Sequence, residues 1–130
     1  MKSQRGFTLT EFLCAITMLA FCLLALVRMA ITTMSTNTWG SDNVIATRLA
    51  QNKIAQLKSG GYAALTISSN PYSDANNPID PLGNSGGYYT RTWTIASGPT
   101  TGTKTITVTI TWRGGAKQTS ISTLMANPGS

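Results

Sequence analysis

The sequence predicts an α+β fold in which one long N-terminal helix packs on a small antiparallel β-sheet. An almost unbroken apolar run, Phe12 to Val27, is followed by a stretch in which apolar residues recur every three or four positions. From Tyr88 onward the pattern changes to a period of two, with threonines alternating with aliphatic and aromatic residues. The roughly 100 residues that follow the apolar run are enough for one hydrophobic core but not for two.

The apolar run is predicted to cross a membrane. Phe12 to Val27 contain a single threonine, and Arg28 closes the run with a long stem that can return its charge to the lipid headgroups. With residues 7–11 included, the segment reaches the about 20 residues that a spanning helix needs. Lys2 and Arg5 precede the run, which favours a cytoplasmic N-terminus and places the residues after Arg28 outside the cytoplasm.

The run is expected to stay in the mature protein. A secretory signal peptide has its small-residue cleavage site after the apolar stretch, whereas this stretch ends in Val27, Arg28 and Met29. The small residue in a suitable context is Gly6, which lies before the run. Cleavage after Gly6 would leave Phe7 as the first residue of an anchored chain.

Glu11 places a carboxylate at the start of this spanning helix. An ionised carboxylate in lipid costs on the order of a few kcal/mol unless it is paired. One interpretation puts Glu11 in the headgroup layer, at the positive end of the helix dipole. In the other, cleavage after Gly6 creates an amine on Phe7, and Glu11 neutralises that amine in the same chain or in a neighbouring one.

The string from Gly6 to Glu11, followed by about 20 mostly apolar residues, resembles the class III prepilin motif of type IV pilins and type II secretion pseudopilins. In that family a prepilin peptidase cleaves after the glycine and methylates the new N-terminal phenylalanine. The glutamate pairs with the N-terminal amine of an adjacent subunit during filament assembly. The resemblance therefore implies cleavage between Gly6 and Phe7, N-methylation of Phe7, and Glu11 as the assembly carboxylate.

The resemblance also implies a pilin-like fold and a set of partners. These partners are the prepilin peptidase, other pilin or pseudopilin subunits, membrane lipid and an inner-membrane assembly platform. The protein would be a single-pass protein of the bacterial inner membrane, with its C-terminal domain periplasmic, until it enters a pilus or pseudopilus. No cofactor is expected.

Two absences favour a minor component over a major pilin. No proline lies between Phe7 and Lys58, and no cysteine follows the apolar run, whereas many major pilins have a kinking proline and a C-terminal disulfide. Leu49 to Lys53 and the strand Thr105 to Trp112 are similar to segments of PilV-type minor pilins. The expected function is a minor type IV pilin that initiates or modifies a pilus. A minor pseudopilin of type II secretion, a DNA-uptake pilin and an anchored domain outside any filament remain alternatives.

The second half of the predicted helix is amphipathic. Ala46, Ala50, Ile54 and Leu57 form one apolar stripe. The Thr-, Ser- and Asn-rich stretch 32–43 predicts bending or local melting, and the two glycines after Ser59 end the helix. The expected segments are a leader peptide (1–6), a transmembrane and assembly helix (7–28), its amphipathic continuation (29–58), an αβ-loop (59–87), and the sheet with a C-terminal tail (88–130).

The sheet and its preceding loop follow from local patterns. Residues 62–87 are rich in Pro, Gly, Asn and Ser and predict a loop. Asp74 and Asp80 could offer oxygen ligands to calcium, but no EF-hand-like spacing is present, so a solvated turn is preferred and no metal site is predicted. The residues expected on one face of three strands are Tyr89, Arg91, Trp93 and Ile95, then Ile106, Val108, Ile110 and Trp112, then Ile121 and Met125.

The composition argues against catalysis. The chain has no histidine, and both cysteines, Cys14 and Cys22, lie inside the apolar run, so no enzyme is expected. The chain carries a net charge of +6, and four cations fall in the sheet region near aromatic residues. Such a surface would suit nucleic acid. The preferred interpretation is that the aromatic side chains face the core and the cations keep the domain soluble. The four cations are Arg91, Lys104, Arg113 and Lys117.

Overall fold

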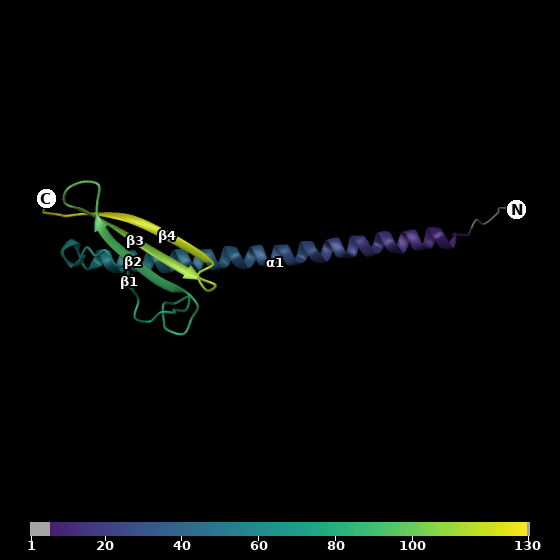
Figure 1. Ribbon diagram of the computed structural model, residues 1–130, viewed down its shortest axis with the longest axis horizontal. Coiled ribbons are helices and arrows are strands. Elements are labelled where there is room, and N and C mark those ends of the chain that lie inside the picture. Colours follow the sequence, from purple (N-terminus) through teal and green to yellow (C-terminus); the bar gives the residue numbers. More distant parts are fainter. Residues whose placement is uncertain (1–5, 130) are drawn as a thin grey trace. The chain divides into compact units, whose positions relative to one another are not determined.

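The computed structural model describes residues 6–129 (Figure 1). Residues 1–5, which include Lys2 and Arg5 of the expected leader, lie outside the described part. The chain divides into two units, one ending at Gly40 and the other beginning at Ser41. The elements are helix α1 (Leu9–Ser59), the 3-10 helix η1 (Tyr62–Ala64), and strands β1 (Tyr72–Ser73), β2 (Thr90–Ser97), β3 (Thr103–Trp112) and β4 (Lys117–Ala126).

The first unit contains the beginning of α1, whose sequence is long and apolar enough to span a membrane. The predicted local melting in 32–43 is wrong, because α1 continues without a break through this stretch. The hydroxyls of Thr32, Thr36 and Thr38 each donate a hydrogen bond of 2.9 to 3.0 Å to the carbonyl oxygen four residues earlier. The helix itself therefore satisfies these polar side chains.

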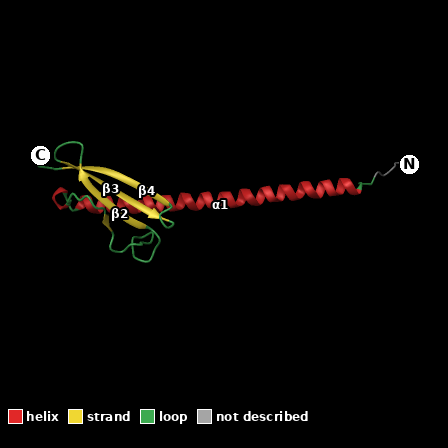
Figure 2. Ribbon diagram, viewed as in Figure 1, coloured by secondary structure: helices red, strands yellow, loops and turns green. Residues whose placement is uncertain are grey.

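The second unit is built on a four-stranded antiparallel sheet in the order β1-β2-β3-β4. Figure 2 shows β2, β3 and β4 side by side in yellow. The three predicted strands are confirmed as β2, β3 and β4, and each follows its neighbour through a short turn. Their registers are continuous, from Thr90 opposite Thr111 through to Trp112 opposite Lys117. Together with α1, this sheet confirms the predicted α+β class.

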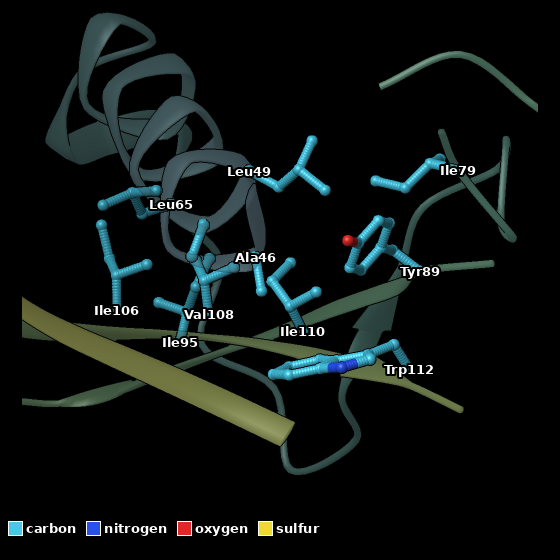
Figure 3. Packing of buried hydrophobic residues seen from close by; sticks show 11 residues of the cluster. Ala46, Leu49, Leu65, Ile79, Tyr89, Ile95, Ile106, Val108, Ile110 and Trp112 are labelled. Atoms are coloured by element: carbon cyan, nitrogen blue, oxygen red, sulfur yellow. The ribbon is translucent and has the colours of Figure 1, made fainter. Parts of the chain in front are cut away.

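The core lies between the second part of α1 and one face of this sheet. Ala46 and Ala50 of the predicted stripe are fully buried, and Ile54 and Leu57 pack at its margin. Leu49, which the predicted stripe omitted, is also buried, and burying such a side chain contributes about 1.5 to 3 kcal/mol. Figure 3 shows Ala46 and Leu49 of the helix facing residues of the sheet and of the loop before it. The sheet and loop contribute Leu65, Ile79, Tyr89, Ile95, Ile106, Val108, Ile110 and Trp112.

The segment between α1 and β2 contributes to the core more than its composition predicted. Ile79 is fully buried and pairs with Tyr89 through hydrogen bonds of 2.7 and 3.1 Å between their backbones. The short strand β1 was not predicted, because two residues are too few for a periodic pattern. At the start of the segment Gly61 adopts a φ of 83°, a conformation that favours glycine after a helix end.

Candidate functional site

Thr8 fixes the point at which α1 begins. Its side-chain oxygen accepts a hydrogen bond of 3.2 Å from the backbone N–H of Glu11, and its carbonyl oxygen accepts one of 3.1 Å from Phe12. Threonine is a good N-cap because its hydroxyl satisfies a donor that the first helical turn leaves free. Phe7 consequently lies outside the helix, with 87% of its surface exposed.

This cap places Glu11 in the first turn of α1. The helix dipole favours a negative charge at that position. Within residues 6–129 the two salt bridges are Arg91 to Asp74 and Arg113 to Asp42, and neither involves Glu11. The carboxylate is exposed and available to a charge from outside this polypeptide, or to the amine that cleavage would create on Phe7.

The apolar side chains that follow Glu11 are exposed around the whole circumference of the helix. Leu13, Met18 and Phe21 keep 56, 74 and 69% of their surface exposed. A helix that is apolar on every side requires lipid or other helices around it. Cys14 and Cys22 are free thiols on this same surface. This part of α1 is therefore a single-helix membrane anchor.

A second cluster ties the sheet to the other part of α1. Asp42 is 6% exposed, and its carboxylate accepts hydrogen bonds from Tyr88 (3.1 Å), Tyr89 (3.3 Å) and Arg113 (3.3 Å). Burial, together with the contacts to Tyr88 and Asp42, raises the pKa of the Tyr89 hydroxyl. The three partners of Asp42 lie 46, 47 and 71 positions further along the chain, where no spacing rule could have found them.

Arg91 forms a third cluster on the same side of the sheet. Its guanidinium donates to the Asp74 carboxylate through Nε, at 2.8 Å, and through a second nitrogen, and it also reaches the Leu49 carbonyl oxygen at 3.4 Å. Lys53 lies over the Trp93 ring at 3.9 Å. The predicted solvated turn is wrong for Asp74, whose side chain is only 12% exposed.

The Asp74 carboxylate gives the second unit a defined acid sensitivity. Desolvation alone would raise its pKa, but hydrogen bonds from Arg91 and from the Asn76 N–H outweigh desolvation and hold the pKa below the usual value. A lowered native pKa means that Asp74 contributes stability above about pH 4 and that this contribution is lost as the pH falls further. We expect Asp74→Asn to lower the free energy of unfolding at pH 7 by about 1 to 3 kcal/mol and to weaken its dependence on pH below 4. Urea unfolding in detergent micelles at pH 7 and pH 3 tests this, and equal losses at both values would contradict it.

Arg91, Lys104 and Arg113 of the sheet region bind groups within the second unit. Lys104 donates to the carbonyl oxygens of Tyr62 (3.0 Å) and Leu65 (2.6 Å), and its ammonium lies 4.1 Å from the centre of the Tyr62 ring. Arg91 and Arg113 bind carboxylates, as described above. Of the neighbouring aromatic residues, Tyr89 and Trp112 are buried and Trp93 is partly buried, whereas Tyr88 keeps 53% of its surface exposed. These contacts favour the structural interpretation of the basic residues over a nucleic-acid surface.

The acidic residues do not converge on a metal site. In the part of the chain that the structure describes, no group of three or more His, Cys, Asp or Glu side chains is arranged to hold a metal ion. Asp80 accepts hydrogen bonds from the backbone N–H groups of Leu82 (2.8 Å) and Asn84 (2.9 Å) within its own turn. These bonds hold the pKa of Asp80 below its usual value.

Comparison with known proteins places the N-terminal segment in a recognised class. A family model described as a prokaryotic N-terminal methylation motif, the class III prepilin signal, matches residues 1–27. No curated protein and no solved structure gives a significant match. The matched residues include Gly6, Phe7 and Glu11 and end with the apolar run. The proteins with this motif are structural rather than enzymatic. The motif, the apolar anchor helix and the helix-on-sheet fold together support a type IV pilin-like or pseudopilin protein.

Proposed function

We propose that this protein is a minor type IV pilin that assembles through its N-terminal helix to initiate or modify a pilus. In this proposal prepilin peptidase removes leader 1–6 after Gly6 and methylates Phe7. The observation that best supports the proposal is the arrangement of residues at the N-terminus of α1. Phe7 lies outside a helix capped by Thr8, Glu11 occupies the first turn without a salt bridge among residues 6–129, and apolar side chains cover every face that follows.

Assembly would use charge pairing followed by helix packing. The mature N-terminal amine of one subunit neutralises the Glu11 carboxylate of another, so that both charges can enter a low-dielectric bundle. The exposed apolar side chains of 12–27 then exchange lipid for neighbouring anchor helices. Their close packing and van der Waals contacts stabilise the bundle. The protein needs no catalytic group for this role.

The topology we propose is that of a single-pass protein of the bacterial inner membrane. Lys2 and Arg5 favour a cytoplasmic N-terminus before processing, which leaves the helix-on-sheet unit in the periplasm. An inner-membrane assembly platform would then move the subunit from lipid into the filament. Two features favour a minor subunit: α1 lacks proline over Leu9–Ser59, and the chain lacks cysteine after Cys22.

The processing step gives the first test. We expect mass spectrometry of the protein from membranes of a host with active prepilin peptidase to find an N-terminus at Phe7 that carries one added methyl group. Gly6→Ala is expected to leave the chain uncleaved with its Met1 start, because the small residue before the scissile bond is changed. A wild-type protein that keeps Met1 would contradict the proposal and make the chain a plain signal-anchored protein.

A gene deletion in the native host separates the minor pilin from its nearest alternative. Loss or shortening of surface pili, with protein secretion unchanged, is the expected result. A secretion defect with normal pili would instead assign the protein to a type II secretion pseudopilus. A defect confined to DNA uptake would assign it to a competence pilus.

A further inference from the structure

The two edge strands of the sheet differ in how much of their outward-facing backbone is covered by other parts of the chain. The outer edge of β2 is covered by the preceding segment of the chain: β1 pairs with Trp93, and the Ser68 N–H donates to the Ile95 carbonyl oxygen at 3.2 Å. The Asn77 side chain imitates a further strand residue, since its amide both accepts from the Arg91 N–H and donates to the Arg91 carbonyl oxygen, each at 2.8 Å. This edge therefore leaves little backbone for another strand.

The opposite edge, formed by β4, has no such cover among the described residues. Strand β4 pairs with β3 on one side and with no strand on the other. The Asn127 N–H donates to the Gly102 carbonyl oxygen at 2.8 Å, which fixes the odd-numbered residues of β4 as those bonded to β3. The backbone N–H and C=O groups of the even-numbered residues point outward. These residues are Gln118, Ser120, Ser122, Leu124 and Ala126, and all five are exposed.

Strand β4 also lacks the devices that usually protect an edge strand. Natural edges are interrupted by proline, bulges or central charges. Across Lys117–Ala126 there is no proline, the register with β3 has no bulge, and the single charge is at the first residue. Hydrogen bonds between side-chain hydroxyls also hold β4 against β3. The hydroxyl oxygens lie 2.8 Å apart in Thr107 and Ser122, and 2.9 Å apart in Thr109 and Ser120. The result is an uninterrupted template for backbone pairing.

We propose that this β4 edge binds an extended strand of a different pilin-like subunit, which continues the sheet by backbone hydrogen bonds. The inference rests on the proposed function, because it supplies a partner for the assembled protein. An extended segment is the ligand whose N–H and C=O groups repeat at the spacing of the β4 edge. The side chains of β4 define the partner strand further. The residues of the partner strand would be small or polar where they lie beside Ser120 and Ser122. They would be apolar where they lie beside Ile121 and Met125, which are partly buried at the margin of the core.

The fold argues against a second copy of this chain as the occupant. Head-to-tail pairing would bring β4 against the β2 edge of the next copy, which β1 and Asn77 already cover. Antiparallel pairing of β4 with itself would turn the second copy through half a revolution and reverse its α1. Residues 41–59 of the two helices would then run in opposite directions, whereas the subunits of the proposed filament run in the same direction. A different subunit meets neither obstacle.

Site-specific photo-cross-linking in the native host tests this proposal. In the first variant a photo-reactive amino acid replaces Leu124, which is 48% exposed and lies on the uncovered edge of β4. A matched variant carries the same amino acid in place of Thr101, in the turn between β2 and β3. We expect the Leu124 position, and not the Thr101 position, to cross-link to another protein that carries an N-terminal methylation motif. Mass spectrometry identifies the partner and the linked peptide.

Proline substitution distinguishes backbone pairing from a side-chain contact. Ser122→Pro removes an outward N–H and the hydroxyl that bonds Thr107, but no backbone hydrogen bond to β3. Ser122→Ala removes the same hydroxyl and keeps the N–H. We expect the cross-link from Leu124 to fall about tenfold or more with Ser122→Pro and to persist with Ser122→Ala. Absence of the cross-link in the otherwise unchanged chain, a cross-link to a second copy, or full persistence with Ser122→Pro would each overturn the proposal.

The same samples show whether the proposed function fails independently. The N-terminal peptide is sequenced in every preparation, and pili are counted in parallel. A chain that begins at methylated Phe7 and supports pili, but gives no cross-link from Leu124, refutes the edge pairing alone. A chain that keeps Met1 refutes the pilin function, whatever its cross-links are.

Discussion

If the protein assembles as proposed, Glu11→Gln is expected to keep it out of filaments while leaving it cleaved and anchored. Glutamine keeps the size of the side chain but not its charge, so the N-terminal amine of the neighbouring subunit would enter the helix bundle unpaired. Breaking a buried charge pair by removing one partner costs about 3 to 5 kcal/mol, which corresponds to a loss of incorporation of at least about 100-fold. Quantitative mass spectrometry of sheared filaments, relative to the membrane fraction, measures this loss.

Two controls make the Glu11 result specific. Glu11→Asp keeps the charge at a shorter reach and is expected to retain part of the incorporation. The membrane fraction of Glu11→Gln must still contain the chain beginning at Phe7, because the substitution leaves Gly6 and the Thr8 cap in place. Wild-type incorporation of Glu11→Gln would show that the carboxylate is merely a favourable headgroup and dipole contact, and the assembly role of Glu11 would be withdrawn.

Features that depend on neighbouring residues could be predicted from the sequence. The alternation of Ile106, Val108 and Ile110 with threonines gave the second predicted strand its buried face, and these three residues are fully buried in β3. The Ala46 and Ala50 stripe likewise predicted the helix face that lies on the sheet. The string from Gly6 to Glu11 predicted the prepilin class that the methylation motif supports. Such patterns carry information because one face of an element must meet the core along its whole length.

Features that depend on distant residues could not be predicted in this way. Asp42 bonds Arg113, and Asp74 bonds Arg91, across separations at which no spacing rule applies. Ile79 lies in a segment whose composition is typical of a loop, yet it is fully buried because it pairs with Tyr89. In these cases the sheet topology brings the partners together. The sequence offers only an unpaired charge or an isolated apolar residue as a signal.

The error at 32–43 has a different cause. Helix propensity penalises Thr, Ser and Asn because their side chains compete for backbone groups outside helices. Here the side-chain hydroxyls bond to carbonyl oxygens of their own helix, so they do not draw the backbone into a non-helical conformation. The residues are Thr32, Thr33, Thr36 and Thr38. Helix propensity therefore predicted an interruption at residues that α1 includes without a break.

Gly87→Ala is expected to destabilise the helix-on-sheet unit by about 3 kcal/mol, at the upper end of the usual range for overpacking. A Cβ at this position would lie 1.9 Å from the Ile79 carbonyl oxygen and 2.3 Å from the Asp80 backbone nitrogen. Both atoms belong to the backbone, so no side chain can rotate away to relieve the contact. The Ile79 and Tyr89 backbones would have to separate, which exposes Ile79 and disturbs the Tyr89 contact with Asp42. Thermal unfolding of the full chain in detergent micelles, followed by the near-ultraviolet circular dichroism of its Tyr and Trp residues, measures the loss.

Gly40→Ala provides the matched control for Gly87→Ala. A Cβ on Gly40 meets no atom within 4 Å, and the residue lies inside α1, where alanine is favoured over glycine by up to about 1 kcal/mol. The same chemical change is thus expected to leave stability unchanged or slightly raised at Gly40 and to lower it strongly at Gly87. If both variants unfolded at the wild-type temperature, the pairing of Ile79 with Tyr89 would not contribute to the stability of the sheet. The loop would then be a surface segment, as its composition alone suggests, and Tyr89 would depend on Asp42 and the core for its position.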